Sequence, residues 1–286
     1  MERLGAKGGT IVLPKGEWTS NGPIHFKSRI GLHVPEGTHL KFSRDPDHYL
    51  PMVFTRWEGT ECWNYSPLIY AHGATDIAIT GKGTIDGQGF EGFFIWRPKQ
   101  RDSQQLLRKM GAEGVPVSER RFGPGHFLRP GFVQFVNCQR ILIDGPRFID
   151  STFWMIHPVY CDHVTVRNVS LKSDHLNSDG IDPDSSTNVL IERCIFDVGD
   201  DGVAIKAGPI TATYSIARAG GRAGGARVPA GRRIELSRRS RFRADDRGAV
   251  NAARFCQAAV CIQRVDGCSK RGTSVDTWRT EPAGAS

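Results

Sequence analysis

Two short segments of the sequence concentrate side chains that can carry charge and move protons. The first, NSDGIDPDSS, spans residues 177–186, and the second, DVGDDGVAIKAG, spans residues 197–208. Their candidate residues are Asn177, Asp179, Asp182, Asp184, Asp200 and Asp201. Clustered carboxylates can bind a cation, form backbone turns, or divide the roles of acid and base in a hydrolysis. Their spacing and the elements that carry them decide among these kinds of chemistry.

A calcium loop of the EF-hand type does not fit the first segment. Aligning Gly180 as the invariant glycine of such a loop puts His175 at the first ligand position and Ser186 where a glutamate is needed. The seven cysteines include no C-x-x-C pair and no histidine at zinc spacing. We therefore expect no metal site, no disulfide framework and no cofactor.

The carboxylates lie in a repeat of short strands. Apolar runs that begin at Ile141, Val164 and Val189 are separated by 23 and then 25 residues, and similar runs begin at Ile30 and Ile77. The strands are rich in Ile and Val and end at Gly, Asn or Asp, which is not a helical pattern. The repeat predicts an all-β fold, a parallel β-helix of about 21–25 residues per coil. An antiparallel sandwich is the alternative, but its Asn-Gly hairpin signals are nearly missing.

Coils of this length would place Asp179 and the Asp200–Asp201 pair one turn apart. Three carboxylates would then meet on one patch, where like charges force their pKa values apart, so that one group holds a proton while others stay ionised. Hydrolysis of a glycosidic bond needs this combination, an acid for the leaving oxygen and a base for water. Turns at coil corners are the simpler interpretation for three other residues, Asp184, Asn188 and Asp197.

The composition changes after Gly208. Residues 1–208 hold 23 Lys and Arg against 24 Asp and Glu, whereas residues 209–286 hold 15 against 6, with 14 Arg and no His. Three interpretations are open: a GC-rich gene read out of frame, a disordered extension, or an Arg-rich arm for nucleic acid. We expect the first. Residues 1–208 are then a partial β-helix domain, and residues 209–286 are a disordered, non-native tail.

Several motifs together resemble glycoside hydrolase family 28, the polygalacturonases and their relatives. They are YSPLIYAHGATDIAITGKGTIDGQG, FWMIHPVYCDHVTVRNV, NSDGIDPDSS and GDDGVAIKAG, and they follow the family's order within residues 8–208. The segment RFGPGHFLRPGFVQF is similar to the bacterial, exo-acting members. The resemblance implies a right-handed parallel β-helix and an inverting hydrolysis of the α-1,4 bonds between galacturonic acid units in pectin.

Carried over residue by residue, the resemblance implies roles for four residues of the acidic segments. Asp200 would be the general acid, and Asp179 and Asp201 would activate water. Asn177 would orient the cluster by hydrogen bonding, with a corner turn as its alternative role.

Two further candidates, His157 and Lys206, could contact the substrate. A packed solenoid interior is the favoured alternative for His157 and for its neighbour Trp154. An ion pair with Asp201 is the alternative for Lys206, and the sequence leaves both interpretations open.

The chain departs from the family pattern in two respects. Gly202 stands where the family usually has Cys. The family's G-H-G and R-I-K motifs, which supply a histidine and the cations for the substrate carboxylate, are missing after Gly208, and RRIEL at residues 232–236 is no equivalent. We therefore expect a fragment that also lacks the N-terminal capping helix. It keeps the acid and base aspartates and can be inactive as it stands.

The expected partner is pectin, polygalacturonate or oligogalacturonides, bound by a monomer, with no nucleic acid and no membrane. Rhamnogalacturonan hydrolysis is the closest variant, and a noncatalytic β-helix that binds acidic polysaccharide is the alternative from another class. A polysaccharide lyase would need a calcium cluster and a basic residue, which do not accompany Asp179 and Asp200. No signal peptide is visible after Met1. The compartment stays open, because the family has secreted, periplasmic and cytoplasmic members.

Overall fold

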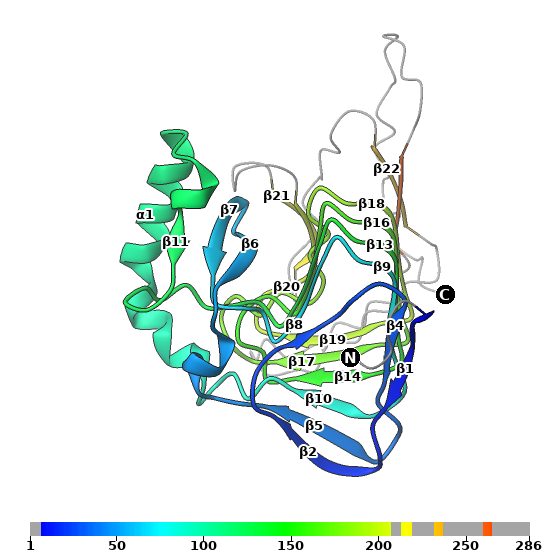
Figure 1. The fold of residues 1–286 in the computed structure, drawn as a ribbon. Coiled ribbons are helices and arrows are strands. Elements are labelled where there is room, and N and C mark those ends of the chain that lie inside the picture. The colour runs from blue at the N-terminus through cyan, green and yellow to red at the C-terminus, as the bar shows by residue number, and fades with distance from the viewer. Residues whose placement is uncertain (1–6, 207–212, 219–231, 237–259, 265–286) are drawn as a thin grey trace, which may run out of the picture.

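Short strands stacked in three parallel sheets dominate the chain (Figure 1). The computed structural model describes residues 7–206, 213–218, 232–236 and 260–264. The predicted parallel β-helix is confirmed, and the alternative of an antiparallel sandwich is wrong. No helix among the described residues is long and apolar enough to cross a membrane.

Each sheet takes one strand from each coil. The first sheet stacks β1 (Gly9–Val12), β4 (Ile30–His33), β9 (Thr75–Thr80), β13 (Gln139–Asp144), β16 (Asp162–Arg167) and β18 (Thr187–Glu192). The second sheet stacks β2 (Gly16–Ser20), β5 (Thr38–Phe42), β10 (Thr84–Asp86), β14 (Arg147–Ile149), β17 (Ser170–Ser173) and β19 (Ile195–Val198). The third stacks β3 (Ile24–His25), β8 (Ile69–His72), β12 (Val133–Val136) and β15 (Ile156–Val159).

The third sheet continues beyond β15 by isolated bridges. Ile156 pairs with Ile181, and Ile181 pairs in turn with Val203 of β20 (Asp201–Lys206). Both acidic segments therefore belong to this sheet and its edge.

The register of the strands reproduces the repeat seen in the sequence. Ile141 pairs with Val164, and Val164 pairs with Val189, in parallel ladders. The number of residues per coil that the apolar runs predict is therefore the number of residues between paired positions of neighbouring strands in the first sheet.

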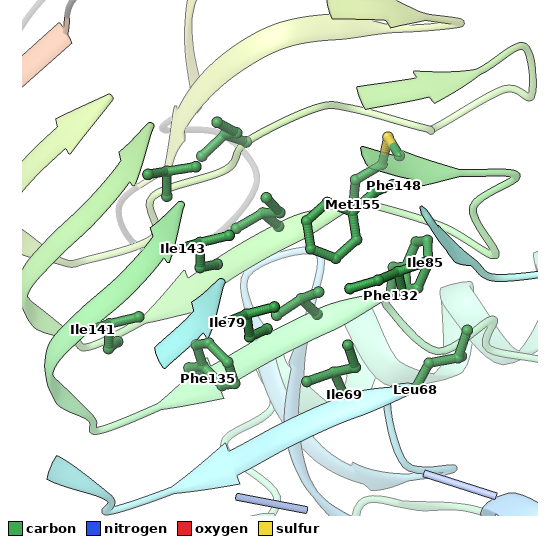
Figure 2. Close-up of a cluster of buried hydrophobic side chains, with 14 of the residues drawn as sticks. Leu68, Ile69, Ile79, Ile85, Phe132, Phe135, Ile141, Ile143, Phe148 and Met155 are labelled. Atoms are coloured by element: carbon green, nitrogen blue, oxygen red, sulfur yellow. The ribbon is translucent and has the colours of Figure 1, made fainter. Parts of the chain in front are cut away.

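Inward-facing apolar side chains form continuous columns between the sheets. The third sheet supplies Ile69, Val133, Ile156, Ile181 and Val203. The first supplies Ile79, Ile143, Val166 and Ile191, and the second supplies Ile85, Phe148, Leu171 and Phe196. None of these is more than 6% exposed. Figure 2 shows part of this core. Burial of each such side chain contributes about 1.5–3 kcal/mol, so stacking of coil on coil stabilises the fold.

Residues with left-handed backbone conformation recur at three corners of the coils. Gly73, Asn137, Tyr160 and Ser185 occupy the first corner, with φ between 51° and 65°. Asp76, Arg140, His163 and Asn188 occupy the second, with φ between 52° and 59°. Gly81, Gly145, Asn168 and Arg193 occupy the third, with φ between 52° and 107°. Seven of these twelve residues are Gly, Asn or Asp, which adopt this conformation most readily.

Two insertions interrupt the coils and pack against the third sheet (Figure 1). The first contains the short helix η2 (Pro46–Tyr49) and the hairpin of β6 (Val53–Trp57) and β7 (Thr60–Asn64). The second contains η3 (Phe93–Lys99), α1 (Gln100–Ala112), η4 (Val117–Glu119) and β11 (Arg121–Phe122), which pairs with β7. Trp57, Leu107 and Trp154 share a buried cluster that joins these insertions to the coils.

Helix α1 was not expected in an all-β chain. Its sequence, QRDSQQLLRKMGA, has no proline and no β-branched residue, and it buries Leu107 against the hairpin cluster. The helix belongs to an insertion, and the coils themselves are β throughout.

The tail contributes three short strands among the described residues. They are β21 (Thr213–Arg218), β22 (Arg232–Leu236) and β23 (Val260–Arg264). Strand β21 pairs with β20, and β23 pairs with β18 and β22, all antiparallel. Within the part of the chain that the structure describes, β20 is the last strand that continues the parallel repeat. We expected a disordered, non-native tail; these three strands are the part of it that the structure describes, and the rest lies outside the described residues.

Candidate active site

Asp179 and Asp201 lie at equivalent positions of neighbouring coils. Met155 donates its backbone N–H to the Asp179 carbonyl at 2.8 Å, and Gly180 donates to the Asp201 carbonyl at 2.9 Å. The column at this sheet edge is therefore Trp154, Asp179 and Asp201. The two carboxylates are one coil apart, as the repeat predicts.

The three aspartates of the cluster differ in exposure. Asp179 is 5% exposed and Asp201 is 7% exposed, whereas Asp200 is half-buried. The Asp200 carboxylate accepts a hydrogen bond from the Asp201 backbone N–H at 3.1 Å. Of the three, Asp200 has the most surface for a partner from solvent.

The glycine after Asp179 permits the close stacking of these coils. A Cβ on Gly180 would lie 2.5 Å from the Gly202 carbonyl oxygen and 2.6 Å from the Phe196 ring. A Cβ on Gly202 would meet Phe196 only at 3.5 Å or more, which is ordinary contact. The structure therefore requires glycine at position 180, whereas position 202 has room for a Cβ.

Lys206 crosses the cluster and is almost completely buried, at 6% exposure. Its Nζ lies 3.1 Å from Asp179 Oδ2 and 3.4 Å from Asp182 Oδ1. The same ammonium lies 3.8 Å from the centre of the Trp154 ring. The sequence offered Asp201 or a substrate carboxylate as its partner, but Lys206 pairs with Asp179 and Asp182.

Burial and charge perturb the pKa values of this cluster strongly. Burial raises the pKa of Asp179 to about 6, although the charge of Lys206 partly offsets it. Burial also raises the pKa of Asp182 well above its ordinary value. For Lys206, burial acts to lower the pKa, but the carboxylates of Asp182 and Asp179 outweigh it and raise the pKa above its ordinary value. Lys206 thus places a cation beside two carboxyl groups, those of Asp179 and Asp182, whose pKa values are raised.

Asn177 is oriented by a buried arginine, Arg129. The Arg129 guanidinium is fully buried, and its Nη2 donates to Asn177 Oδ1 at 2.8 Å. Its other nitrogens donate to Gln100 Oε1 at 2.7 Å and to the Leu176 carbonyl at 3.2 Å. Asn177 also has a left-handed backbone with φ of 62°. The left-handed backbone fits the corner turn, whereas the orientation of the cluster by Asn177 stays a prediction.

His157 is placed in the interior, at 2% exposure. Gln134 Nε2 donates to its Nδ1 at 2.8 Å, so Nε2 carries the proton and faces Asp184 Oδ2 at 3.5 Å. Burial lowers the pKa of the His157 imidazole, which is therefore neutral near pH 7. The surface that a sugar contact requires is absent from His157, and we assign the residue to the packed network.

Asp184 is the centre of that network, not only a corner residue. Its Oδ2 lies 3.1 Å from Arg56 Nε, and Asp184 is fully buried. Burial alone would raise the pKa of Asp184, but His157 and then Arg56 outweigh it and lower the pKa. Arg56 also bonds to Tyr160 and Glu61, so the ion pair attaches the β6–β7 hairpin to the third sheet.

Sequence reasoning missed three residues that shape this site. Asp182 was a candidate residue without an assigned role, although its position three residues after Asp179 could have suggested a shared partner. Arg129 and Arg56 had no local signal, because their partners Asn177 and Asp184 are distant in sequence.

Known proteins with the same β-helical fold are similar to this chain in sequence as well. Residues 122–221 match the family model for glycosyl hydrolases family 28. The chain is similar to a hyperthermoactive exopolygalacturonase from Thermotoga maritima, with 45% identity and a TM-score of 0.69 over 72% of this chain and 49% of that one. A family 28 exopolygalacturonase from Yersinia enterocolitica shows the same fold, with 22% identity and a TM-score of 0.54 over 70% of this chain and 40% of that one.

A probable polygalacturonase from Vitis vinifera is 29% identical over 217 residues, which are 73% of this chain and 39% of that protein. The chain belongs to glycosyl hydrolases family 28 and is polygalacturonase-like. It spans half or less of the length of these relatives, at 49%, 40% and 39%.

Proposed function

We propose that this chain is a pectin hydrolase that cleaves α-1,4 bonds between galacturonic acid units with inversion. The observation that carries the proposal is the stacking of Asp179 on Asp201 with Asp200 beside them. The names of its relatives support galacturonan as the substrate class. Rhamnogalacturonan remains the variant that the same aspartates would serve.

Each aspartate has a role in this mechanism. Asp200, the half-buried member, is the general acid that protonates the leaving glycosidic oxygen. Asp179 and Asp201 accept the proton of the attacking water on the opposite face of the sugar. Asp179 can act as a base only above its pKa of about 6, when it is ionised. Asn177, held by Arg129, orients the cluster.

Release of new reducing ends from polygalacturonate tests this proposal. The unmutated full chain should release them, and NMR of the first product should show inverted anomeric configuration. Asp200→Asn and Asp179→Asn should each lower kcat by about 10²–10⁴-fold, the usual contribution of general acid or base catalysis. Asp197→Asn, which changes an aspartate paired with Lys172 at 2.8 Å on β19, should leave kcat unchanged.

Other products would overturn the proposal in distinguishable ways. Reducing ends from rhamnogalacturonan alone would change the substrate, and an unsaturated product would indicate a lyase. Binding of polygalacturonate without any cleavage would leave a noncatalytic binder. This last outcome is expected if the G-H-G and R-I-K motifs, which the sequence lacks after Gly208, are indispensable.

A further inference from the structure

Beside the acidic cluster, three rings form an exposed aromatic surface. Phe90 stacks on His175 with ring centres 5.4 Å apart and planes inclined by 21°. It also stacks on Phe94 at 6.2 Å and 18°, and Phe94 lies 4.7 Å from His175. Phe90 is 60% exposed, whereas Phe94 and His175 are half-buried. We call Phe90, Phe94 and His175 the aromatic ledge.

One carboxylate holds the ledge in place. Asp150 Oδ1 accepts the Phe90 backbone N–H at 3.0 Å and lies 2.6 Å from His175 Nε2. The loop that carries Phe90 is thereby tied to the coil that carries His175. The exposed ring is a positioned surface, which reduces the conformational entropy lost when a ligand binds to it.

The ledge adjoins the candidate catalytic residues on two sides. A Cβ on Gly199, the residue before Asp200, would lie 2.4 Å from the His175 carbonyl oxygen, so the two backbones touch. The Arg129 guanidinium lies 5.4 Å from the centre of the Phe94 ring and donates to Asn177. Asn177 comes two residues before Asp179, and the ledge is therefore continuous with the acidic cluster.

An exposed cation, Arg97, accompanies the ledge. It follows Phe94 by three residues in the 3₁₀ helix η3, where residues at that separation lie above one another. Burial, and next the charge of Arg97, lower the pKa of Arg129 to about 10, which agrees with a position near the ledge. Within residues 7–206, Arg97 makes no ion pair with an acidic side chain. Its guanidinium is available to an anion from solvent.

We propose that the aromatic ledge and Arg97 form a subsite for one uronic acid unit of the polysaccharide cleaved at Asp179 and Asp200. The apolar face of the sugar ring lies on Phe90, and the sugar carboxylate pairs with the Arg97 guanidinium. Stacked rings bury apolar area with defined geometry, and arginine binds carboxylates through two parallel hydrogen bonds. This proposal rests on the proposed function, since it takes the substrate class from there.

Binding to a catalytically blocked full chain tests the subsite without turnover. In an Asp200→Asn background, the affinity for a length series of oligogalacturonides is measured by calorimetry. Arg97→Gln should weaken binding roughly tenfold, the effect of losing one charge-assisted pair. Phe90→Ala should weaken it roughly fivefold, whereas Phe90→Leu should recover only part of the loss.

Matched controls separate the subsite from general charge and surface effects. Arg101→Gln removes another exposed arginine of the same insertion, and Trp18→Ala removes an aromatic residue that is 41% exposed on β2. Both should bind as the background chain does. With methyl-esterified oligogalacturonides, the deficit of Arg97→Gln should disappear and that of Phe90→Ala should persist, because only the carboxylate contact is lost.

The outcomes distinguish this proposal from the proposed function. If the unmutated chain releases reducing ends while Arg97→Gln and Phe90→Ala bind like the background, the subsite is wrong and the hydrolase stands. If the deficit of Arg97→Gln is the same on esterified ligands, the carboxylate contact is wrong. If neither the unmutated chain nor the blocked chain binds oligogalacturonides, both proposals fall.

Discussion

Among single residues, Lys206 determines how the acidic cluster can ionise. It pairs with Asp179 and Asp182 while only 6% exposed. Removing one partner of a buried ion pair leaves an uncompensated charge, which is far more costly than the loss of a surface pair. The cation is therefore a positioning residue for Asp179, and its effect on proton affinity can be measured.

Replacement of Lys206 by glutamine should shift the titration of Asp179 to higher pH. The lysine charge lowers the pKa of Asp179, which burial raises to about 6, so its loss raises the pKa further. Since Asp179 must be ionised to accept a proton, activity should be lost at a higher pH on the acid side than in the unmutated chain. The pH profile of kcat/KM and NMR titration of the Asp179 carboxyl carbon measure the shift.

The raised pKa of Asp179 also predicts how the stability of the fold changes with pH. The folded pKa of about 6 lies above the unfolded value, about 3.9. Asp179 therefore stabilises the fold fully below the unfolded pKa, and this contribution is lost as pH rises through the folded pKa.

The control for the Lys206 titration is Lys172→Gln, which removes an exposed lysine paired with Asp197 and should leave the titration of Asp179 unchanged. A lower pKa in Lys206→Gln would contradict the assignment.

Among the elements, the two neighbouring coils that carry the acidic cluster approach each other closely at one pair of glycines. Gly180 and Gly202 follow Asp179 and Asp201 at equivalent positions, yet only the first faces a backbone oxygen at a distance that excludes a side chain. Close approach of the two coils at this point therefore requires glycine at position 180.

Gly180→Ala should destabilise the fold by about 1–3 kcal/mol, the usual cost of overpacking. Its Cβ would lie 2.5 Å from the Gly202 oxygen and 2.6 Å from Phe196. Gly202→Ala is the matched control and should change the free energy of unfolding by less than about 1 kcal/mol. Chemical denaturation measures both, and equal losses for the two variants would refute this account of the packing.

The elements also show how far the sequence could predict this structure. The coils were predictable because their strands repeat locally, and the stacking of Asp179 on Asp201 followed from the coil length. The partner of Lys206 was not, since several carboxylates lie within reach of a long side chain. The ion pair of Arg56 with Asp184 depends on how the hairpin docks, and no periodic signal encodes that contact.

In the whole molecule, stability should vary from coil to coil. Strand β1 is mostly exposed, and among the described strands it lies at one end of the first sheet, beside β4. Strand β13 lies between β9 and β16. A solenoid is stabilised mainly by nearest-neighbour interfaces, so a coil with one neighbour opens before a coil with two.

Native-state hydrogen exchange should therefore show a gradient along the stack. Amides of β1 should exchange fastest, and those of β13 and β16 should exchange slowest, near the rate set by global unfolding. Mass spectrometry of peptides from each coil measures this order. Equal protection of β1 and β13 would mean that residues 7–206 unfold as one cooperative unit.

The three columns of left-handed corner residues restrict which changes in chain length the fold can accept. A segment of one whole coil, inserted with its own corner residues, would leave Arg140, His163 and Asn188 in line. A single residue inserted into a strand would turn its inward side chains outward and move the next corner out of its column. Insertions or deletions that preserve the fold should therefore comprise whole coils. They would change the number of sugar units that the proposed binding surface spans without disturbing the aspartates.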